Sequence, residues 1–445
     1  MIRGKSDLAA ILPTVVLMAA IVFSCMPPKQ TTPDPKDLSY IYNPLKTPLN
    51  PRYGVFNESE NKSVLFVKFF STDLYFNEAN PQGISLAIIT AGVKVYNLTH
   101  GKALSDTALV TFQVPREKGK LEYLYKIPLT VEKGCEYIAE VKILDNIREI
   151  SVQGFVPFNT LSEFNRYNFY ARGHLQKNEL LKPMVRNGEF FNLIYGGPRP
   201  DSLFISVFKP YTEFPYPPSM VLPEKPMATE PDTVVALPYS DTLALMFPRK
   251  GIFFCSVGRK IKEGYTFMNF GSEFPGMSTP EQMIEPLCYL ASEDEMTELK
   301  ANPKPKMALD GFWLKCGGNI EKSRELIRIY YTRVLYANYY FTSYKEGWRT
   351  DRGMVYIIYG PPDRIYKSPE GEIWGYRKQV VKTTWGTNYS VREKYLEFNF
   401  RRKDDIYSDN EYSISRSETE ISYWDKAVLA WRRGIVFRLD NPSDL

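Results

Sequence analysis

The sequence predicts a mainly β protein with an α+β domain at its C-terminal end. Its 445 residues include 31 Tyr, 27 Phe and 33 Pro, a composition typical of strands joined by short turns. Apolar and polar residues alternate in the first third of the chain, most clearly over residues 136–143. After residue 277 the apolar residues recur instead at the spacing of a helix.

The composition also narrows the class of protein. With 44% hydrophobic and 24% charged residues, the chain is globular rather than disordered. The net charge of +5 is too small to indicate a nucleic-acid partner. Only two histidines, His100 and His174, are present, which leaves little room for chemistry that depends on histidine.

Residues 1–24 have the pattern of a secretory signal peptide. Two cations, Arg3 and Lys5, precede an apolar run of roughly 16 residues, shorter than the ~20 that span a bilayer. The run ends in Val22-Phe23-Ser24-Cys25, which resembles a bacterial lipobox, so Cys25 is the predicted lipidation site. Residues 25–54, which contain seven prolines, are then expected to form a tether.

The cellular location of the protein is predicted from its resemblance to bacterial sorting signals. No Asp directly follows Cys25, which favours the outer membrane, and no acidic cluster follows, which favours the periplasmic face over the cell surface. Four Asp-Ser/Thr triplets also resemble the acceptor of periplasmic O-glycosylation in Bacteroidota. The predicted acceptors are Thr107, Ser202, Thr233 and Thr242.

The cysteines that remain give no metal site. Their scattered positions show no CxxC spacing, and two histidines do not complete a zinc site around them. They form disulfides in one of three pairings, or stay as single buried thiols. These cysteines are Cys135, Cys255, Cys288 and Cys316.

Two β-rich modules are expected before the C-terminal domain. Residues 55–158 predict an immunoglobulin-like β-sandwich, with strands at 63–70, 84–96, 108–114, 121–129, 136–144 and 149–155. Residues 159–277 predict a second β-rich sandwich module, with strands at 190–195, 202–208, 242–247 and 251–257. A proline-rich long loop or edge crossing is expected over 209–238, whose aromatic stretch 211–216 either docks a partner or wraps its own domain.

Residues 278–445 are expected to hold helices followed by a small α+β domain. Thr279-Pro280-Glu281 indicates a helix start, residues 292–300 a short helix, and Asn319 a helix cap. The longest helix is predicted over 321–341, and a strand and a last helix over 395–400 and 423–434. The long helix places five apolar residues on one face: Leu326, Tyr330, Val334, Ala337 and Phe341.

A motif follows the long helix. It reads Gly347-Trp348-Arg349-Thr350-Asp351-Arg352-Gly353, then an apolar run over 354–359 that predicts a strand, then Gly360-Pro361-Pro362-Asp363. This pattern resembles the GWxTD domain of predicted lipoproteins in Bacteroidota. The resemblance covers 278–445 and includes Phe312-Trp313 and Glu372-Ile373-Trp374. The resemblance implies a cellular location rather than an activity, because the family has no established reaction.

The motif is interpreted as a folding device. Gly347 suits a positive φ after the helix, Trp348 packs helix against sheet, and Thr350 and Asp351 bond backbone amides at the start of the strand. The Gly360-Pro361-Pro362-Asp363 turn then ends that strand. A binding role for the motif stays open, as does a catalytic one in which Asp351 is a general acid or base beside Arg349 or Arg352.

No catalytic residue, cofactor or metal is predicted, because the sequence lacks HExxH, GxSxG, GxGxxG and Walker A patterns. We therefore expect a non-catalytic, outer-membrane-anchored lipoprotein rather than an enzyme. It would be a scaffold or accessory subunit of an envelope complex for protein secretion, outer-membrane protein assembly or nutrient uptake. The alternative is a glycan-binding or glycan-processing envelope lipoprotein, whose six Trp residues and loop 211–216 would stack on sugars.

Overall fold

The computed structural model of the chain describes residues 37–43, 45, 49–81, 83–218, 220, 225–385, 388–416 and 418–439. The predicted signal peptide 1–24 and the lipidation site Cys25 lie outside these residues. The described residues from Leu38 onward belong to one unit, discussed below. The predicted fold class is confirmed, because antiparallel sheets come first and helices with one further sheet follow.

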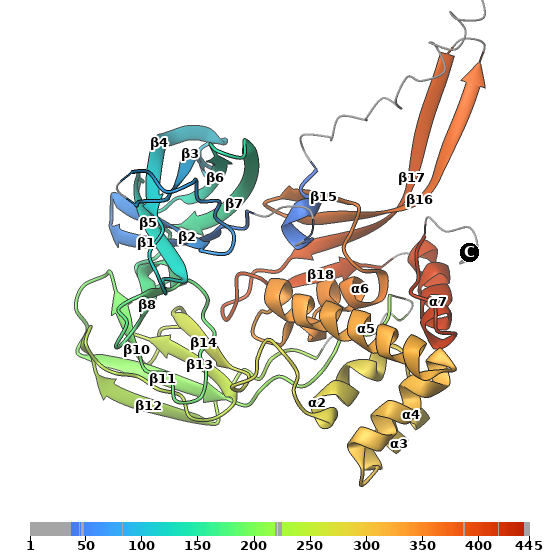
Figure 1. The fold of residues 1–445 in the computed structure, drawn as a ribbon. Helices are drawn as coiled ribbons and strands as arrows, with labels where there is room; N and C mark the ends of the chain where they lie inside the picture. The colour runs from blue at the N-terminus through green and yellow to red at the C-terminus, as the bar shows by residue number, and fades with distance from the viewer. Residues whose placement is uncertain are drawn as a thin grey trace, which may run out of the picture. The chain divides into compact units, whose positions relative to one another are not determined.

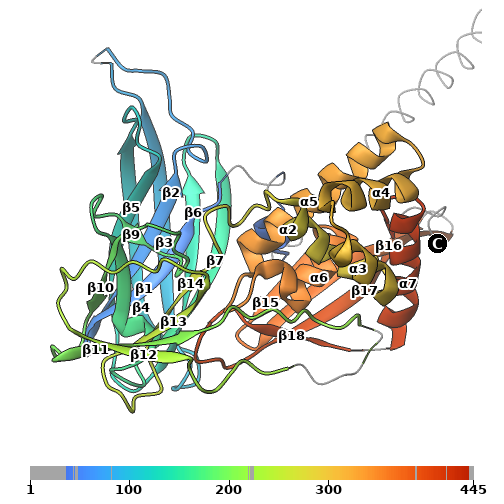
Figure 2. The same cartoon turned by 90° about the horizontal axis from the view of Figure 1, so that it is seen from below.

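The first module is a β-sandwich of two antiparallel sheets, ordered β1-β2-β5 and β4-β3-β6-β7 (Figures 1 and 2). The alternation predicted for 136–143 is real: Tyr137, Ala139, Val141 and Ile143 of β6 are all buried. They meet the inward side chains of the other sheet in one core. The strands are β1 (Arg52–Ser59), β2 (Lys62–Phe70), β3 (Leu86–Asn97), β4 (Ala103–Pro115), β5 (Glu122–Thr130), β6 (Glu136–Asp145) and β7 (Ile150–Asn159).

The second module also has two antiparallel sheets, ordered β10-β8-β9 and β12-β11-β13-β14. Its core is rich in phenylalanine, with Phe191, Phe247 and Phe267 in mutual ring contact. The strands are β8 (Phe169–Gly173), β9 (Glu179–Leu180), β10 (Phe191–Tyr195), β11 (Ser202–Phe208), β12 (Thr233–Pro238), β13 (Gly251–Ser256) and β14 (Tyr265–Asn269).

Two predictions for this module are wrong. The segment 242–247 is not a strand and contributes only a single bridge, between Leu245 and Phe191. The end of the predicted loop 209–238 is strand β12, which pairs with β11 at the edge of its sheet. Pro238 is tolerated there because it is the last residue of an edge strand.

In the C-terminal domain, helices pack with a four-stranded antiparallel sheet, ordered β15-β16-β17-β18, around a shared core (Figure 1). The predicted helix starts are confirmed, with N-caps at Thr279, Ser292 and Asn319. The helices are α2 (Pro280–Ile284), α3 (Glu293–Ala301), α4 (Pro305–Gly317), α5 (Ile320–Phe341), α6 (Asp351–Tyr359) and α7 (Glu418–Arg432). The strands are β15 (Arg364–Ser368), β16 (Gly371–Trp385), β17 (Asn388–Arg402) and β18 (Tyr412–Ser415).

The apolar run 354–359, predicted as a strand, is helix α6. Every residue of α6 is buried, so its apolar residues surround the helix and leave no helical period to read. The helix is started by the Thr350 hydroxyl, which accepts a hydrogen bond from the Gly353 amide at 3.0 Å. Gly360, with φ of 84°, follows its last residue.

The predicted tether 25–54 is wrong in its described part. Ser39–Tyr42 form a 3-10 helix whose neighbour Leu38 and last residue Tyr42 are buried in the core of the C-terminal domain. The Leu38 amide also donates to the Ile365 carbonyl at 2.8 Å. Four aromatic or aliphatic side chains in five residues pack against this core, Leu38 and Tyr42 as buried residues and Tyr40 and Ile41 as partly buried ones. They bury enough surface to fix this segment, despite the prolines around it.

The four cysteines beyond Cys25 are free, and three of them are buried: Cys135, Cys255 and Cys316. Single thiols, the second of the two alternatives, are therefore what the structure contains. None of the helices in the described part of the chain combines the length and the apolar character needed to cross a bilayer.

Candidate functional site

The two glycines of the motif allow a close approach of backbones. A Cβ at Gly347 would overlap the carbonyl group of Ala337 in α5, and one at Gly353 would overlap the carbonyl of Gly347. Gly347 does not have the positive φ that we predicted; the contact with α5, not the backbone conformation, requires glycine there. The motif is thus pressed against the long helix that precedes it.

Trp348 is fully buried and hydrogen-bonded at both ends. Its backbone amide donates to Asn338 Oδ1 at 3.1 Å, and its indole N–H donates to Glu346 at 3.2 Å. The Tyr289 hydroxyl donates to the Trp348 carbonyl at 2.6 Å. Its ring meets the Tyr289 ring edge-on, and it belongs to the core that the helices share with the sheet.

Thr350 and Asp351 also serve the fold. The Thr350 hydroxyl donates to the Gly347 carbonyl at 2.7 Å while it caps α6. Asp351 is buried, and its Oδ2 accepts from the Ile414 amide of β18 at 2.9 Å. Its neighbour Arg349 stacks on Trp348 at 4.0 Å. The side chains that a catalytic interpretation requires are therefore engaged in holding the helix, the sheet and the motif together.

Arg349 also explains the aromatic loop 211–216. Its guanidinium donates to the Thr212 carbonyl and to Glu285. Tyr211 and Phe214 pack edge-on against Tyr344 and Tyr289. These partners belong to the C-terminal domain, so the loop reaches beyond its own domain, which it was expected either to wrap or to leave free for a partner.

A buried ion cluster lies beside the motif. Glu372 Oε1 accepts from Arg352 at 3.1 Å, from Lys367 at 2.9 Å and from the Tyr42 hydroxyl at 2.8 Å. Its Oε2 accepts from the Trp374 indole at 2.9 Å. Burial alone would raise the pKa of Glu372, but the charges of Lys367 and Arg352 lower it to about 2. Sequence reasoning missed this cluster, because nothing in their spacing along the chain predicts that these residues meet.

A cavity of about 470 Å³ borders this cluster and is lined by both β modules and the C-terminal domain. Several buried polar atoms of its lining have no hydrogen-bond partner among the described residues. They are Arg52 Nε and Nη2, the Tyr53 hydroxyl and the Thr266 hydroxyl. Buried donors of this kind are costly unless a ligand or water satisfies them.

The cavity is also electropositive. Arg52 and Lys182 both lie over the Tyr339 ring, at 4.2 and 4.1 Å from its centroid. Burial lowers the pKa of both side chains, and the charge of Arg52 lowers that of Lys182 further. The Lys182 ammonium donates to the Tyr339 carbonyl at 2.8 Å. Among the described lining residues, Asp409 is the one carboxylate, against the cations Arg52, Arg166, Lys182 and Lys367. Lys367 is paired with Glu372 and Arg166 lies 3.9 Å from Asp409, so Arg52 and Lys182 supply the charge of the cavity.

This arrangement suits the binding of an anion. An anionic acceptor bound at Arg52 would supply the hydrogen bonds that its two nitrogens lack and would offset the repulsion between Arg52 and Lys182. The lining holds no pair of carboxylates of the kind that glycosidases use, as far as the structure describes it. Sequence reasoning missed this site as well, since its residues come from distant segments.

The predicted glycosylation acceptors are dispersed. Thr107 is exposed within β4, Thr233 is exposed at the start of β12, and Thr242 is exposed in a turn. Ser202 is half-buried as the first residue of β11. Only Thr242 thus has the loop position that we expected of an acceptor.

Comparison with known proteins bears on the C-terminal half. A family model described as the GWxTD domain matches residues 251–433, so the match begins in β13 and not at residue 278. No curated protein matches the chain. One solved structure is similar over 37% of this chain and 16% of its own, at 10% identity and a TM-score of 0.18. It is Bacteroides uniformis beta-glucuronidase 2 covalently bound to cyclophellitol-6-carboxylate aziridine, and a similarity this low supports no conclusion.

Proposed function

This chain is a GWxTD-domain protein, and from that premise we propose that it is a non-catalytic lipoprotein of the outer membrane of a member of the Bacteroidota. It acts by binding. It is anchored through Cys25, on the periplasmic face, and belongs to an envelope complex as a scaffold or accessory subunit. Protein secretion, outer-membrane protein assembly and nutrient uptake are the processes in which such a subunit would serve.

The observation that carries the proposal is the electropositive cavity. Arg52 has two buried nitrogens without a partner, and Lys182 lies over the same tyrosine ring. Two desolvated cations that share one aromatic ring are costly for folding, and a ligand with negative charge removes much of that cost. We therefore propose that the partner places an anionic group against Arg52, within reach of the charge of Lys182.

The use of the motif supports binding over turnover. The Thr350 hydroxyl and the Asp351 carboxylate make hydrogen bonds within the fold, and Arg349 pairs with two carboxylates and a carbonyl. A catalytic group needs access to a substrate, and these groups are directed into the protein. The motif then positions the helices and sheet that form one wall of the cavity.

Affinity purification of the tagged chain from mild-detergent membranes, followed by mass spectrometry, tests the proposal. The wild type should recover a stoichiometric envelope partner, and an Arg52→Met/Lys182→Met double variant should lose it. Lys209→Met is the matched control, because the Lys209 side chain is 85% exposed and remote from the lining. Recovery of the wild-type protein alone would contradict the scaffold role.

Glycan binding is the second candidate, and the tyrosines of the cavity favour it. Ten tyrosines in the cavity lining offer rings and hydroxyls to sugars: Tyr40, Tyr42, Tyr53, Tyr167, Tyr170, Tyr265, Tyr339, Tyr340, Tyr407 and Tyr412. Tryptophan platforms are less favoured, since five of the six Trp residues are buried and the side chain of Trp385 lies outside the described residues. Polysaccharide arrays test this function; binding of acidic polysaccharides that Lys182→Met abolishes would support it.

A further inference from the structure

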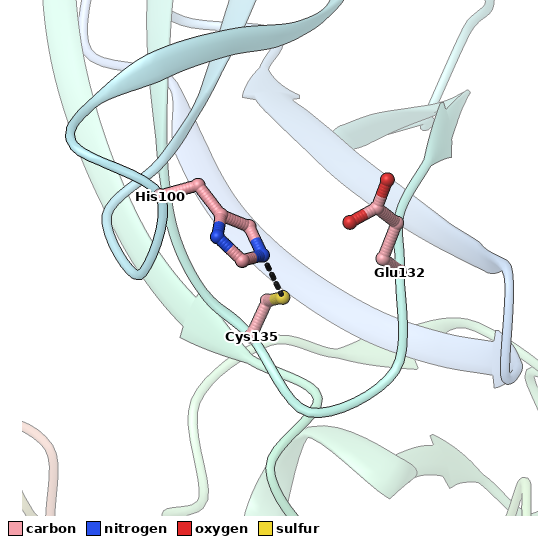
Figure 3. A group of neighbouring side chains, drawn as sticks. All are labelled: His100, Glu132 and Cys135. Atoms are coloured by element: carbon pink, nitrogen blue, oxygen red, sulfur yellow. Dashed lines mark hydrogen bonds between the residues drawn. The ribbon is translucent and has the colours of Figure 1, made fainter.

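Three side chains able to bind a metal meet at one end of the first β-sandwich (Figure 3). They are His100, in the turn between β3 and β4, and Glu132 and Cys135, in the loop between β5 and β6. One potential ligand atom from each lies within 4.8 Å of the others. None of the three belongs to the motif or to the lining of the electropositive cavity.

The sulfur of Cys135 and the ring nitrogen of His100 are spaced like two ligands of one zinc ion. Cys135 Sγ and His100 Nε2 are 3.7 Å apart, and Figure 3 shows the ring and the thiol pointing at each other. Tetrahedral zinc, with Zn–S of about 2.3 Å and Zn–N of about 2.0 Å, places such a pair about 3.5 Å apart. For Cys135 and His100 the ion fits with a shift of only tenths of an ångström, whereas the Glu132 oxygen, in a group whose ligand atoms lie within 4.8 Å of one another, must move by about 1 Å to join them. Thiolate, imidazole and carboxylate are the ligand types that zinc takes.

The backbone that carries the ligands is fixed by hydrogen bonds. The Thr160 hydroxyl accepts from the Cys135 amide at 3.1 Å and donates to the Glu132 carbonyl at 2.5 Å. In the other loop, the His100 amide donates to Asn97 Oδ1 at 3.2 Å. Both loops thus hold their positions without an ion, and a preorganised site binds more tightly than one that must fold around the metal.

One of the three ligand side chains is buried and the other two are exposed, an arrangement that suits a metal site. Cys135 is buried, whereas His100 and Glu132 are exposed. An ion can therefore arrive from solvent and reach the thiol without opening the sandwich core. A buried thiol beside an exposed imidazole and carboxylate also leaves one side of the ion open to water.

We propose that this cluster binds one Zn²⁺ through Cys135 Sγ, His100 Nε2 and a carboxylate oxygen of Glu132, with water in the fourth position. On binding, the S–H bond of the thiol breaks, its proton passes to solvent and the S–Zn bond forms. No oxidation state changes. The site is independent of the proposed partner cavity, and it ties the β3–β4 turn to the β5–β6 loop.

Titration of the chelator-stripped full chain tests the site. Calorimetry with Zn²⁺ should give one equivalent bound and about one proton released near neutral pH. Co²⁺ as a probe should give the thiolate-to-cobalt charge-transfer absorption that only a cysteine ligand produces. Cys135→Ser should abolish that absorption, and His100→Ala should weaken Zn²⁺ binding about 100-fold or more, since even outer-shell changes cost 10- to 100-fold.

The chain offers a matched control for each ligand. His174→Ala removes the other histidine, and Cys255→Ser removes a buried thiol that lies in another module. Both should bind Zn²⁺ as the wild type does. His100→Ala and Glu132→Gln alter exposed side chains, so they decide the matter if Cys135→Ser fails to fold by circular dichroism. Absence of the charge-transfer band in the wild type, or equal weakening in the His174→Ala control, would overturn the proposal.

Discussion

Replacing Glu372 by Gln removes the one negative charge at the centre of the buried ion cluster. The carboxylate accepts hydrogen bonds from Arg352, Lys367 and Trp374, and both Glu372 and Arg352 are only 1% exposed. Glutamine keeps the size of the side chain, so no cavity forms. It leaves Arg352, which is buried, and Lys367, whose side chain is 27% exposed, facing a neutral amide.

The magnitude can be worked out from the pKa of Glu372. Burial alone would raise it, but Lys367 and Arg352 lower it from an ordinary 4.5 to about 2. The difference, 4.5 minus 2, is about 2.5 units, which corresponds to about 3 kcal/mol of folding free energy. Removing one partner of a buried ion pair costs about 3–5 kcal/mol in other proteins, in agreement. We expect Glu372→Gln to lower the free energy of unfolding by about 3 kcal/mol at neutral pH.

The sign of the pH dependence follows from the direction of the shift. The pKa of Glu372 is lower in the folded than in the unfolded chain, so the stabilisation is complete above pH 4.5 and is lost as the pH falls toward 2. The wild type should therefore lose stability across this range. The free energy of unfolding of Glu372→Gln should fall less steeply with pH in this range. The stabilities of the two proteins should converge as the pH approaches 2.

Tryptophan fluorescence during urea unfolding is the assay, because all six tryptophans lie between residues 313 and 431. The signal thus reports the C-terminal domain and not the β modules that precede it. Asp310→Asn is the control: it breaks an exposed pair with Lys306 in the same domain, which is expected to cost less than about 1 kcal/mol. A loss in Glu372→Gln no larger than in this control would refute the reasoning.

Three further substitutions test the packing and the cavity. Gly347→Ala should destabilise the domain by at least about 3 kcal/mol in the same urea experiment, because its Cβ would overlap the Ala337 carbonyl. Gly311→Ala is the control, since a Cβ there meets nothing, and it should be neutral or stabilising by up to about 1 kcal/mol. Thr350→Ala should lower the free energy of unfolding by about 1 kcal/mol, because the N-cap of α6 is lost. Thr350→Ser keeps a hydroxyl at the cap and should keep most of that stability. Lys182→Met should raise the melting temperature in calorimetry; since the folded pKa of Lys182 is lowered, the gain should shrink as the pH rises toward 10.5, and a constant gain would contradict this assignment.

The parts of the fold that sequence predicts well are those with one buried face. In α5 the five predicted core residues, from Leu326 to Phe341, are all buried. In β6 every second residue is buried. An element between core and solvent must sort its side chains by face, and this sorting leaves a period that can be read without any knowledge of the tertiary structure.

Helix α6 shows where that reading stops. Its residues are buried on all sides, so six consecutive apolar side chains suit a buried strand as well as a buried helix. The deciding signal was local and present: Thr350 followed by Asp351 is a helix N-cap with an acid in the first turn. We assigned both residues to a strand entry, and the apolar run outweighed the cap.

The candidate sites are harder to predict because each joins segments that only the fold brings together. Glu372 accepts from Tyr42, 330 positions earlier, and Lys182 donates to Tyr339, 157 positions later. The cluster of His100 with Cys135 spans 35 positions, and the pairing of β3 with β6 brings the two hairpin ends together. A count of histidines and cysteines in the sequence predicts no metal site. Glu132 joins His100 and Cys135 as a possible ligand only because β3 pairs with β6. Chemistry that rests on distant pairs therefore becomes visible once strand order and register are known, whereas caps, amphipathic faces and turns are visible beforehand.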